Sequence, residues 1–232
     1  MKVQRLRLTY SRGDQAKEMS HLETMRALER ALVEAGLPLA YSEGKRRTPQ
    51  ISVAAPLPVG VTSDCERADV YLSERVSPDA FVEALREAMP AGLEAISARE
   101  VGLLGPAAQL RARWAEYEVD VPRSDRTLDD VRHAVSELMS SSTLPWEHRR
   151  ETKVSSYDLR PLVLALRLET EGEGVYRFRM RLRILPERSG RADQVVAALG
   201  LPGRLRVHRT RLYFDATPAA VRAYRLRSDR ED

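Results

Sequence analysis

Four arginines at alternate positions form the sharpest chemical pattern in this sequence. Between positions 175 and 184 they occupy every second place, as Arg177, Arg179, Arg181 and Arg183. Side chains alternate between the two faces of a β-strand, so all four are expected to project from one face over roughly 20 Å. A row of that length matches roughly three or four phosphates of a nucleic-acid backbone. Arg204 and Arg206, beside the last expected strand, extend the same basic surface.

The competing interpretation is a solvated sheet face whose arginines are paired with carboxylates. Glu169, Glu171 and Asp193 are the nearby acidic residues that would serve as partners. Like charges at neighbouring positions of one face repel each other unless an anion lies between them, which favours phosphate binding. A structure distinguishes the two interpretations by the partners of the guanidinium groups.

The start of the first expected helix carries a second group of candidate residues. Ser20 and Glu23 have the spacing of a capping box, in which the serine accepts an N–H and the glutamate reaches back. Capping explains both residues, and we prefer it to ligand contact for them. It leaves His21 unexplained, and the unpaired N–H groups of a helix start attract anions. His21 and Glu23 are therefore both retained as candidates for contact with a polar ligand.

A polar segment bounded by glycine and proline follows this helix. Its candidates for binding a phosphate or an acidic partner are Tyr41, Ser42, Glu43, Lys45, Arg46 and Arg47. The three consecutive cations suit charge-assisted hydrogen bonds to such a partner. An ordinary surface loop explains the same composition equally well.

A second long connection, residues 141–161, mixes aromatic and basic residues. Trp146 and Tyr157 are of the type that stacks on nucleobases, and Lys153 adds a cation. Asp158 and Arg160 are further candidates for contact with a ligand or partner. Alternatively, these two residues pair locally and fix the turn before the proline at position 161.

Motifs that would indicate catalysis or cofactor binding are absent from the sequence. It contains no P-loop, no G-x-S-x-G turn and no H-E-x-x-H metal motif. Cys65 is the only cysteine and the four histidines are dispersed, so neither an iron–sulfur cluster nor a structural zinc site is expected. We therefore assign no catalytic residue, no metal and no cofactor, and we favour a non-catalytic protein over an enzyme.

The charge of the chain is unevenly distributed. The net charge is +4, with −1 in residues 1–105 and +5 in residues 106–232. A basic half favours an anionic partner. Arginine outnumbers lysine 34 to 4, however, and a genome rich in G and C produces that bias without selection for binding.

The hydropathy pattern indicates a cytoplasmic protein. No apolar run approaches the roughly 18 residues that cross a bilayer. The first seven residues alternate apolar and charged side chains, unlike the apolar segment of a signal peptide.

Hydrophobic periodicity divides the chain into two halves with the same order of elements. Residues 1–105 are expected to form strand, helix, strand, strand, helix and strand at about 3–10, 22–35, 51–55, 68–72, 78–89 and 93–101. The order recurs at about 108–121, 128–139, 162–168, 175–184, 191–199 and 205–214. Gly105-Pro106 marks the boundary, because both residues interrupt regular structure.

This order predicts an α+β fold of two tandem ferredoxin-like (βαββαβ) units. Each is expected to be a four-stranded antiparallel sheet with both helices on one face and the other face open. The predicted domains are 1–105 and a basic domain at 106–232 with the insertion 141–161. The connections 37–50 and 141–161 occupy equivalent places, and two open faces can flank a shared cleft, so function is expected there.

Several short segments of the chain have a distinctive combination of residues. They are 5–7, 20–24, 37–44, 49–52, 57–61 and 157–161, the last with an aspartate-leucine-arginine motif. In these segments the chain resembles the bacterial family of radical SAM-linked, or radical SAM-associated, proteins. That family is a domain of unknown function encoded beside or fused to a radical SAM protein. The resemblance implies a partner that supplies the iron–sulfur cluster and S-adenosylmethionine. Residues 45–47 depart from the family, which has an aromatic-Asn-Pro stretch there.

Three functions are compatible with these observations. The first is a non-catalytic accessory protein that binds RNA and acts with a radical SAM enzyme. The second is a protein-interaction scaffold of such an enzyme without contact to nucleic acid. The third, least favoured, is an enzyme in which His21, Glu23 and Asp158 meet in a cleft between the two domains.

Overall fold

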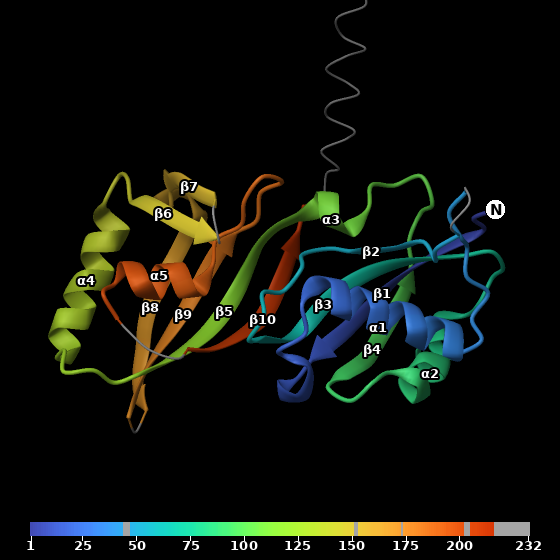
Figure 1. Ribbon diagram of the computed structural model, residues 1–232, viewed down its shortest axis with the longest axis horizontal. Helices are drawn as coiled ribbons and strands as arrows, with labels where there is room; N and C mark the ends of the chain where they lie inside the picture. Colours follow the sequence, from blue (N-terminus) through green and yellow to red (C-terminus); the bar gives the residue numbers. More distant parts are fainter. Residues whose placement is uncertain (44–46, 151–152, 173, 202–204, 216–232) are drawn as a thin grey trace, which may run out of the picture. The chain divides into compact units, whose positions relative to one another are not determined.

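The protein is an α+β chain that forms two compact units. The structure is a computed structural model in which residues 1–43, 47–150, 153–172, 174–201 and 205–215 are described (Figure 1). Of the described residues, the first unit comprises Met1–Ala112 and Leu212–Asp215, and the second comprises Arg113–Arg211, so the first residue of β5 and the last three of β10 are counted with the first unit. This division differs from the expected boundary at residues 105 and 106, because the segment after that point packs on the first unit.

The first unit contains one antiparallel sheet. Its elements are β1 (Gln4–Arg12), a 3₁₀ helix (Asp14–Ala16), α1 (His21–Glu34), β2 (Ile51–Val53), β3 (Val61–Leu72), α2 (Pro78–Ala88), β4 (Leu93–Glu100) and α3 (Ala108–Arg111). The strands follow the order β4-β1-β3-β2. The predicted order of elements is confirmed here, although β3 begins earlier than expected.

Local sequence explains where the two long helices of this unit begin. The Ser20 Oγ accepts the N–H of Glu23 at 3.2 Å, and the Glu23 carboxylate accepts the N–H of Ser20 at 2.8 Å. This is the predicted capping box. In α2, the Ser77 Oγ accepts the N–H of Ala80 at 3.2 Å, and Pro78 lies in the first turn, where no N–H is needed.

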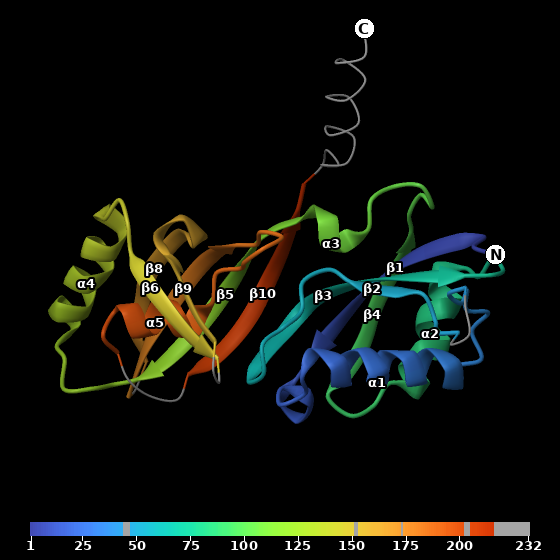
Figure 2. The same ribbon diagram turned by 45° about the horizontal axis from the view of Figure 1, so that its top comes forward.

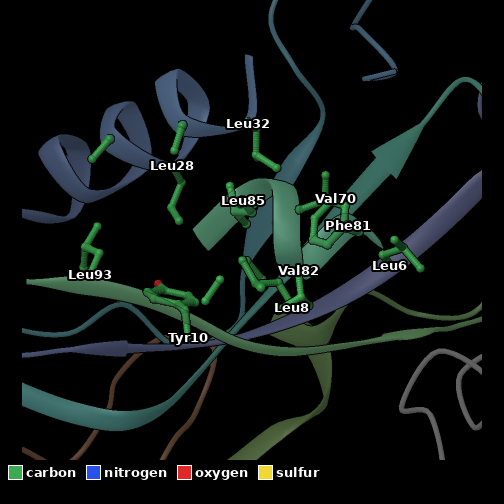
Figure 3. Close-up of a cluster of buried hydrophobic side chains, with 14 of the residues drawn as sticks. Leu6, Leu8, Tyr10, Leu28, Leu32, Val70, Phe81, Val82, Leu85 and Leu93 are labelled. Atoms are coloured by element: carbon green, nitrogen blue, oxygen red, sulfur yellow. The ribbon is translucent and has the colours of Figure 1, made fainter. Parts of the chain in front are cut away.

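Helices α1 and α2 enclose an apolar core against one face of the sheet. Leu6, Leu8 and Tyr10 alternate along β1 and point into that core (Figure 3). They pack with side chains from α1, β3, α2 and β4, among them Leu28, Leu32, Val70, Phe81, Leu85 and Leu93. Burial of each large apolar side chain stabilises the fold by about 1.5–3 kcal/mol.

The opposite face of this sheet, predicted to be open, is covered. The chain around α3 lies on the side away from α1 (Figure 2). The N–H of Ala108 donates to the buried Asp69 carboxylate at 2.8 Å, and Arg5 Nη1 donates to the carbonyl of Gly105 at 2.8 Å. The prediction of an open face is wrong for this unit, because charged residues of β1 and β3 hold the segment 102–111 against it.

The second unit contains a sheet and a separate hairpin. Its elements are β5 (Ala112–Pro122), α4 (Leu128–Ser140), β6 (Pro145–Arg150), β7 (Lys153–Asp158), a 3₁₀ helix (Arg160–Leu162), β8 (Val163–Gly172), β9 (Val175–Arg183), α5 (Ala192–Ala198) and β10 (Arg206–Phe214). Within the unit the strand order is β10-β5-β9-β8, while β6 and β7 pair only with each other. Sequence analysis predicted neither this hairpin nor the single turn of α3.

The core of the second unit lies on one face of its sheet. The inward residues of β9 are at most 1% exposed, and they are Tyr176, Phe178, Met180 and Leu182. Val195 and Val196 of α5 are equally buried, and α5 lies across β8 and β9 in Figure 1. The intervening residues of β9 are exposed, so the other face of this strand is open. Among the described residues, no helix is long and apolar enough to cross a membrane.

Candidate nucleic-acid interface

The second unit presents the four arginines of β9 on an exposed face. Arg177, Arg179 and Arg181 have 44%, 52% and 46% of their side chains exposed, as the alternation predicts. Neighbouring strands contribute to the same side, which we call the ladder face. Its members are Arg167 and Glu169 of β8, Arg177, Arg179, Arg181 and Arg183 of β9, Trp114, Glu116, Glu118 and Asp120 of β5, and Arg206 of β10.

Three of the four arginines of β9 lie opposite a carboxylate of β5. The antiparallel register sets these rungs, which are Arg177 with Asp120, Arg179 with Glu118 and Arg181 with Glu116. Arg177 donates to both oxygens of Asp120, from Nε at 2.6 Å and from Nη2 at 3.0 Å. The shortest N–O distances of the other two rungs are 3.2 Å and 2.6 Å. Arg179 also pairs with Glu169 at 2.9 Å.

These pairs change the protonation of the groups involved. The hydrogen bonds from Arg177 hold the pKa of Asp120 below its ordinary value of 3.8, and the charge of Arg206 lowers it further. In return, the Asp120 carboxylate raises the pKa of Arg177. Asp120 and Arg177 are therefore both ionised at neutral pH.

The repulsion that favoured a bound anion in the sequence is relieved by the protein's own carboxylates. Arg177, Arg179 and Arg181 each pair with a carboxylate on the neighbouring strand β5. Phosphate binding by these three arginines stays a prediction. Of the partners considered from sequence, Glu169 does pair, whereas Asp193 pairs with Arg191. Sequence analysis missed the main partners, although alternating acids at positions 116, 118 and 120 in an expected strand were visible.

Three other arginines of the ladder face make no ion pair with any described carboxylate. They are Arg167, Arg183 and Arg206. Arg167 lies directly opposite Arg179, so two like charges share one rung. Arg183 lies opposite Trp114, and Arg206 is an exposed residue at the start of β10. The predicted contact Arg204 lies outside the described residues. The cations available for an anionic ligand thus lie at the margins of the ladder.

His21 lies beside a small pocket of the first unit. The pocket is lined by Tyr10, Arg12, His21, Thr24, Val53, Pro56, Leu57 and Glu66. The buried Arg12 donates to the backbone carbonyls of Val61 and Met19 at 3.0 Å and 3.1 Å, which ties two loops together. Glu23 is held by the cap, and hydrogen bonds from Ser20 lower its pKa. These contacts account for Glu23 structurally and leave His21 exposed at the pocket rim.

Backbone pairing joins the two ends of the polar segment that follows α1. Tyr41 and Pro49 form a β-bridge, and the N–H of Ser42 donates to the carbonyl of Thr48 at 2.9 Å. Tyr41, Glu43 and Arg47 are exposed. Lys45 and Arg46 lie outside the described residues, so the predicted cation cluster stays a prediction.

Asp158 and Arg160 have structural partners in the second unit. Asp158 Oδ1 accepts the N–H of Leu144 at 2.7 Å and the N–H of Arg160 at 2.9 Å. Arg160 donates to the carbonyls of Ser141, Val163 and Met139 at 3.0, 2.7 and 2.8 Å. The aspartate-leucine-arginine motif therefore joins the end of α4 to the start of β8, and the local interpretation holds. The side chain of Lys153 is not among those described.

The aromatic residues of the β6–β7 hairpin are largely engaged. Trp146 lies opposite Tyr157 in the hairpin register. The Arg188 guanidinium lies 3.7 Å from the centre of the Tyr157 ring, and the Tyr157 hydroxyl donates to Gln194. Burial raises the pKa of Tyr157. One face of this ring is thus already stacked.

The described part of the chain offers no cluster of three or more His, Cys, Asp or Glu side chains that would hold a metal ion. The polar residues of the ladder face are guanidinium and carboxylate groups, which suit charge recognition.

Comparison with known proteins decides the family. Residues 5–192 match the family described as "Uncharacterized protein conserved in bacteria (DUF2344)". The chain belongs to this family. The match includes both units and the whole ladder face except Arg206. No curated protein matches the chain.

Several solved structures are similar at low identity. They include a Cbf5-Nop10-Gar1 complex (TM-score 0.49, 10% identity) and the archaeal box H/ACA sRNP Nop10-Cbf5 complex (TM-score 0.44, 12% identity). Each match covers 88% of this chain, and the chain spans about half the length of those proteins, 48% and 47%. An unknown protein from Galdieria sulphuraria matches over 92% of this chain and 99% of its own, at TM-score 0.26 and 16% identity. TM-scores below 0.5 do not establish a shared function.

Proposed function

We propose that this DUF2344 protein is a non-catalytic accessory protein that binds RNA through the margins of the ladder face and acts with a radical SAM enzyme. The observation that carries the RNA-binding part is the set of exposed arginines that make no ion pair with a described carboxylate, Arg167, Arg183 and Arg206. An exposed cation of this kind can contact a phosphate without first breaking an ion pair.

The distribution of charge between the units supports the same proposal. The segment 113–211 contains nineteen arginines and lysines against fifteen acidic residues, whereas the rest of the chain contains nineteen of each. The excess therefore belongs to the unit that carries the ladder face. A locally positive unit attracts polyanions and accelerates their association.

The strand orders support a finer description of the fold. We propose that each unit is a ferredoxin-like βαββαβ module. The orders β4-β1-β3-β2 and β10-β5-β9-β8, each interleaved with two helices, are those that this topology requires.

A salt series tests the RNA-binding proposal. The probe is a labelled stem-loop RNA with a single-stranded tail, and the variant is Arg167→Gln, Arg183→Gln and Arg206→Gln together. Loss of three phosphate contacts should lower the slope of log K against log[salt] by about 2, and affinity roughly 100-fold at 0.1 M salt. The matched control, Arg26→Gln, Arg30→Gln and Arg132→Gln, removes the same charge from helix surfaces. If both variants lose RNA affinity and salt slope equally, net charge alone explains the loss and these three arginines are not specific contacts. If the wild type does not bind the RNA, the proposal is wrong.

The radical SAM partner rests on the sequence resemblance. Co-purification with a radical SAM protein encoded beside this chain tests it. A complex that survives nuclease and high salt would favour the scaffold alternative over one held together by RNA. Absence of any complex would remove the partner and leave the RNA-binding proposal to its own test.

A further inference from the structure

The fourth rung of the ladder differs from the other three. Along β5 the ladder face reads Trp114, Glu116, Glu118 and Asp120, so each arginine of β9 faces an acid except Arg183. Opposite Arg183 stands an indole ring instead of a carboxylate. Trp114 is partly exposed, although the sheet provides a buried face where a tryptophan would be better shielded from water.

We propose that Trp114 and Arg183 form a contact for one nucleotide of single-stranded RNA, with the base stacked on the indole and the phosphate bound by the guanidinium. This inference rests on the proposed RNA-binding function and names its substrate class. Directly opposed residues of an antiparallel pair have Cβ atoms roughly 5 Å apart, so the two side chains lie within reach of one nucleotide.

Single-stranded RNA is favoured because of what a stacking ring requires. In a duplex, each base is stacked on its neighbours and its flat faces are inaccessible. The exposed part of an aromatic side chain can therefore stack on an unpaired base and not on a paired one. Arg183, at the same rung, can bind the phosphate of that nucleotide because it makes no ion pair with the described carboxylates.

The rest of the ladder fits a strand that crosses the sheet. The Thr210 hydroxyl of β10 donates to the carbonyl of Glu116 in β5 at 3.4 Å, and the charge of Arg206 lowers the pKa of the Asp120 carboxyl, so Arg206 lies toward the other end of the ladder from Trp114. Six residues of β9 separate the two ends, or roughly 20 Å. A strand that stacks on Trp114 can thus reach the other unpaired arginines through its backbone.

The two tryptophans of the chain make the test spectroscopic as well as thermodynamic. Trp146 lies in the β6–β7 hairpin, so Trp146→Phe leaves Trp114 as the only indole. In that variant, a twelve-nucleotide polyuridine strand should quench the indole fluorescence, and a 16-base-pair RNA duplex should leave it unchanged. Trp114→Ala should lower affinity for the single strand by roughly 5- to 150-fold, the range that one lost base–aromatic stack gives. Trp114→Phe should restore most of that loss, with circular dichroism to establish that each variant is folded.

The outcomes separate this inference from the proposed function. If the single strand binds and depends on Arg167 and Arg206, but Trp114→Ala has no effect and the indole is not quenched, the Trp114 contact is refuted and RNA binding stands. Equal quenching by duplex and single strand also refutes it. If neither RNA binds, both proposals fall.

Discussion

Arginines follow the outward side of a strand in both units, yet they are in opposite environments. In the first unit, Arg7 lies opposite Asp69 in the β1–β3 register, and both side chains are at most 2% exposed. In the second unit, Arg179 lies opposite Glu118 in the β5–β9 register, with 52% and 41% exposed. The local pairing is the same, and only the covering chain differs.

Burial determines how much each ion pair contributes to the stability of the fold. Asp69 accepts from Arg7 at 2.7 and 3.0 Å and from the N–H of Ala108 at 2.8 Å, so it fastens the segment 102–111 to the sheet. Removing one partner of such a buried group leaves charges without compensation. On the ladder face, water and salt screen each pair, so its net contribution to stability is small. The buried cluster therefore stabilises the fold, whereas the exposed pairs of the ladder add little to stability.

The largest effect is expected from Asp69→Asn. The substitution leaves the buried Arg7 and Arg5 without a carboxylate, so the free energy of unfolding should fall by about 3–5 kcal/mol. Urea unfolding followed by circular dichroism measures it. Glu118→Gln is the matched change in the second unit and should lower the free energy of unfolding by about 0–1 kcal/mol. If both substitutions lower it equally, burial does not distinguish the ion pairs of the two units.

A second large effect is expected from Arg160→Met. Arg160 donates to three backbone carbonyls between α4 and β8, and Met keeps most of its apolar stem. Loss of these bonds should destabilise the protein by about 2–4 kcal/mol, since hydrogen bonds from a charged donor contribute about 1.5–3 kcal/mol each and are not additive. RNA affinity at temperatures where the variant is folded should stay at the wild-type value. A stable variant that loses RNA binding would move Arg160 from the structural group to the ligand contacts.

Removing a carboxylate from the ladder should strengthen RNA binding. Glu118→Gln releases Arg179 from one of its two partners and removes a negative charge from the face. Affinity for the stem-loop RNA at 0.1 M salt should rise by roughly 5-fold, the gain that one additional phosphate contact gives. Glu137→Gln, on the surface of α4, is the control for charge alone. An unchanged or lower affinity in Glu118→Gln would mean that the ladder does not face the RNA.

The smallest effect concerns acid stability. Because the folded-state pKa of Asp120 lies below 3.8, its contribution is complete above about pH 4–5 and is lost as pH falls through the lowered pKa. Asp120→Asn should therefore be less stable than the wild type near neutral pH, and the difference should shrink between about pH 4 and 2. Unfolding curves at several pH values measure it. A difference that does not change with pH would exclude the Arg177 pair as its cause.

The sequence predicted much of the fold because local rules dominate there. Hydrophobic periodicity and the cap at Ser20 located the helices other than α3 and most strands, and alternation correctly placed the arginines of β9 on an open face. The cover over the first sheet was not predictable, since it depends on the tertiary contacts of Asp69 with Ala108. The partners of the arginines depend on which strand lies beside β9. Pairing between strands that are distant in the sequence cannot be predicted from the residues of one segment alone.

The most direct test compares how the paired and the unpaired arginines of the ladder face affect the salt dependence of RNA binding. One variant removes two whole rungs without changing net charge, through Arg177→Gln with Asp120→Asn and Arg181→Gln with Glu116→Gln. The other removes two marginal cations, through Arg167→Gln and Arg183→Gln. Salt-dependent RNA binding should keep the wild-type slope in the first variant and lose about 1.4 in slope in the second. A first variant that loses as much slope as the second would contradict the assignment of RNA contacts to the margins of the ladder face.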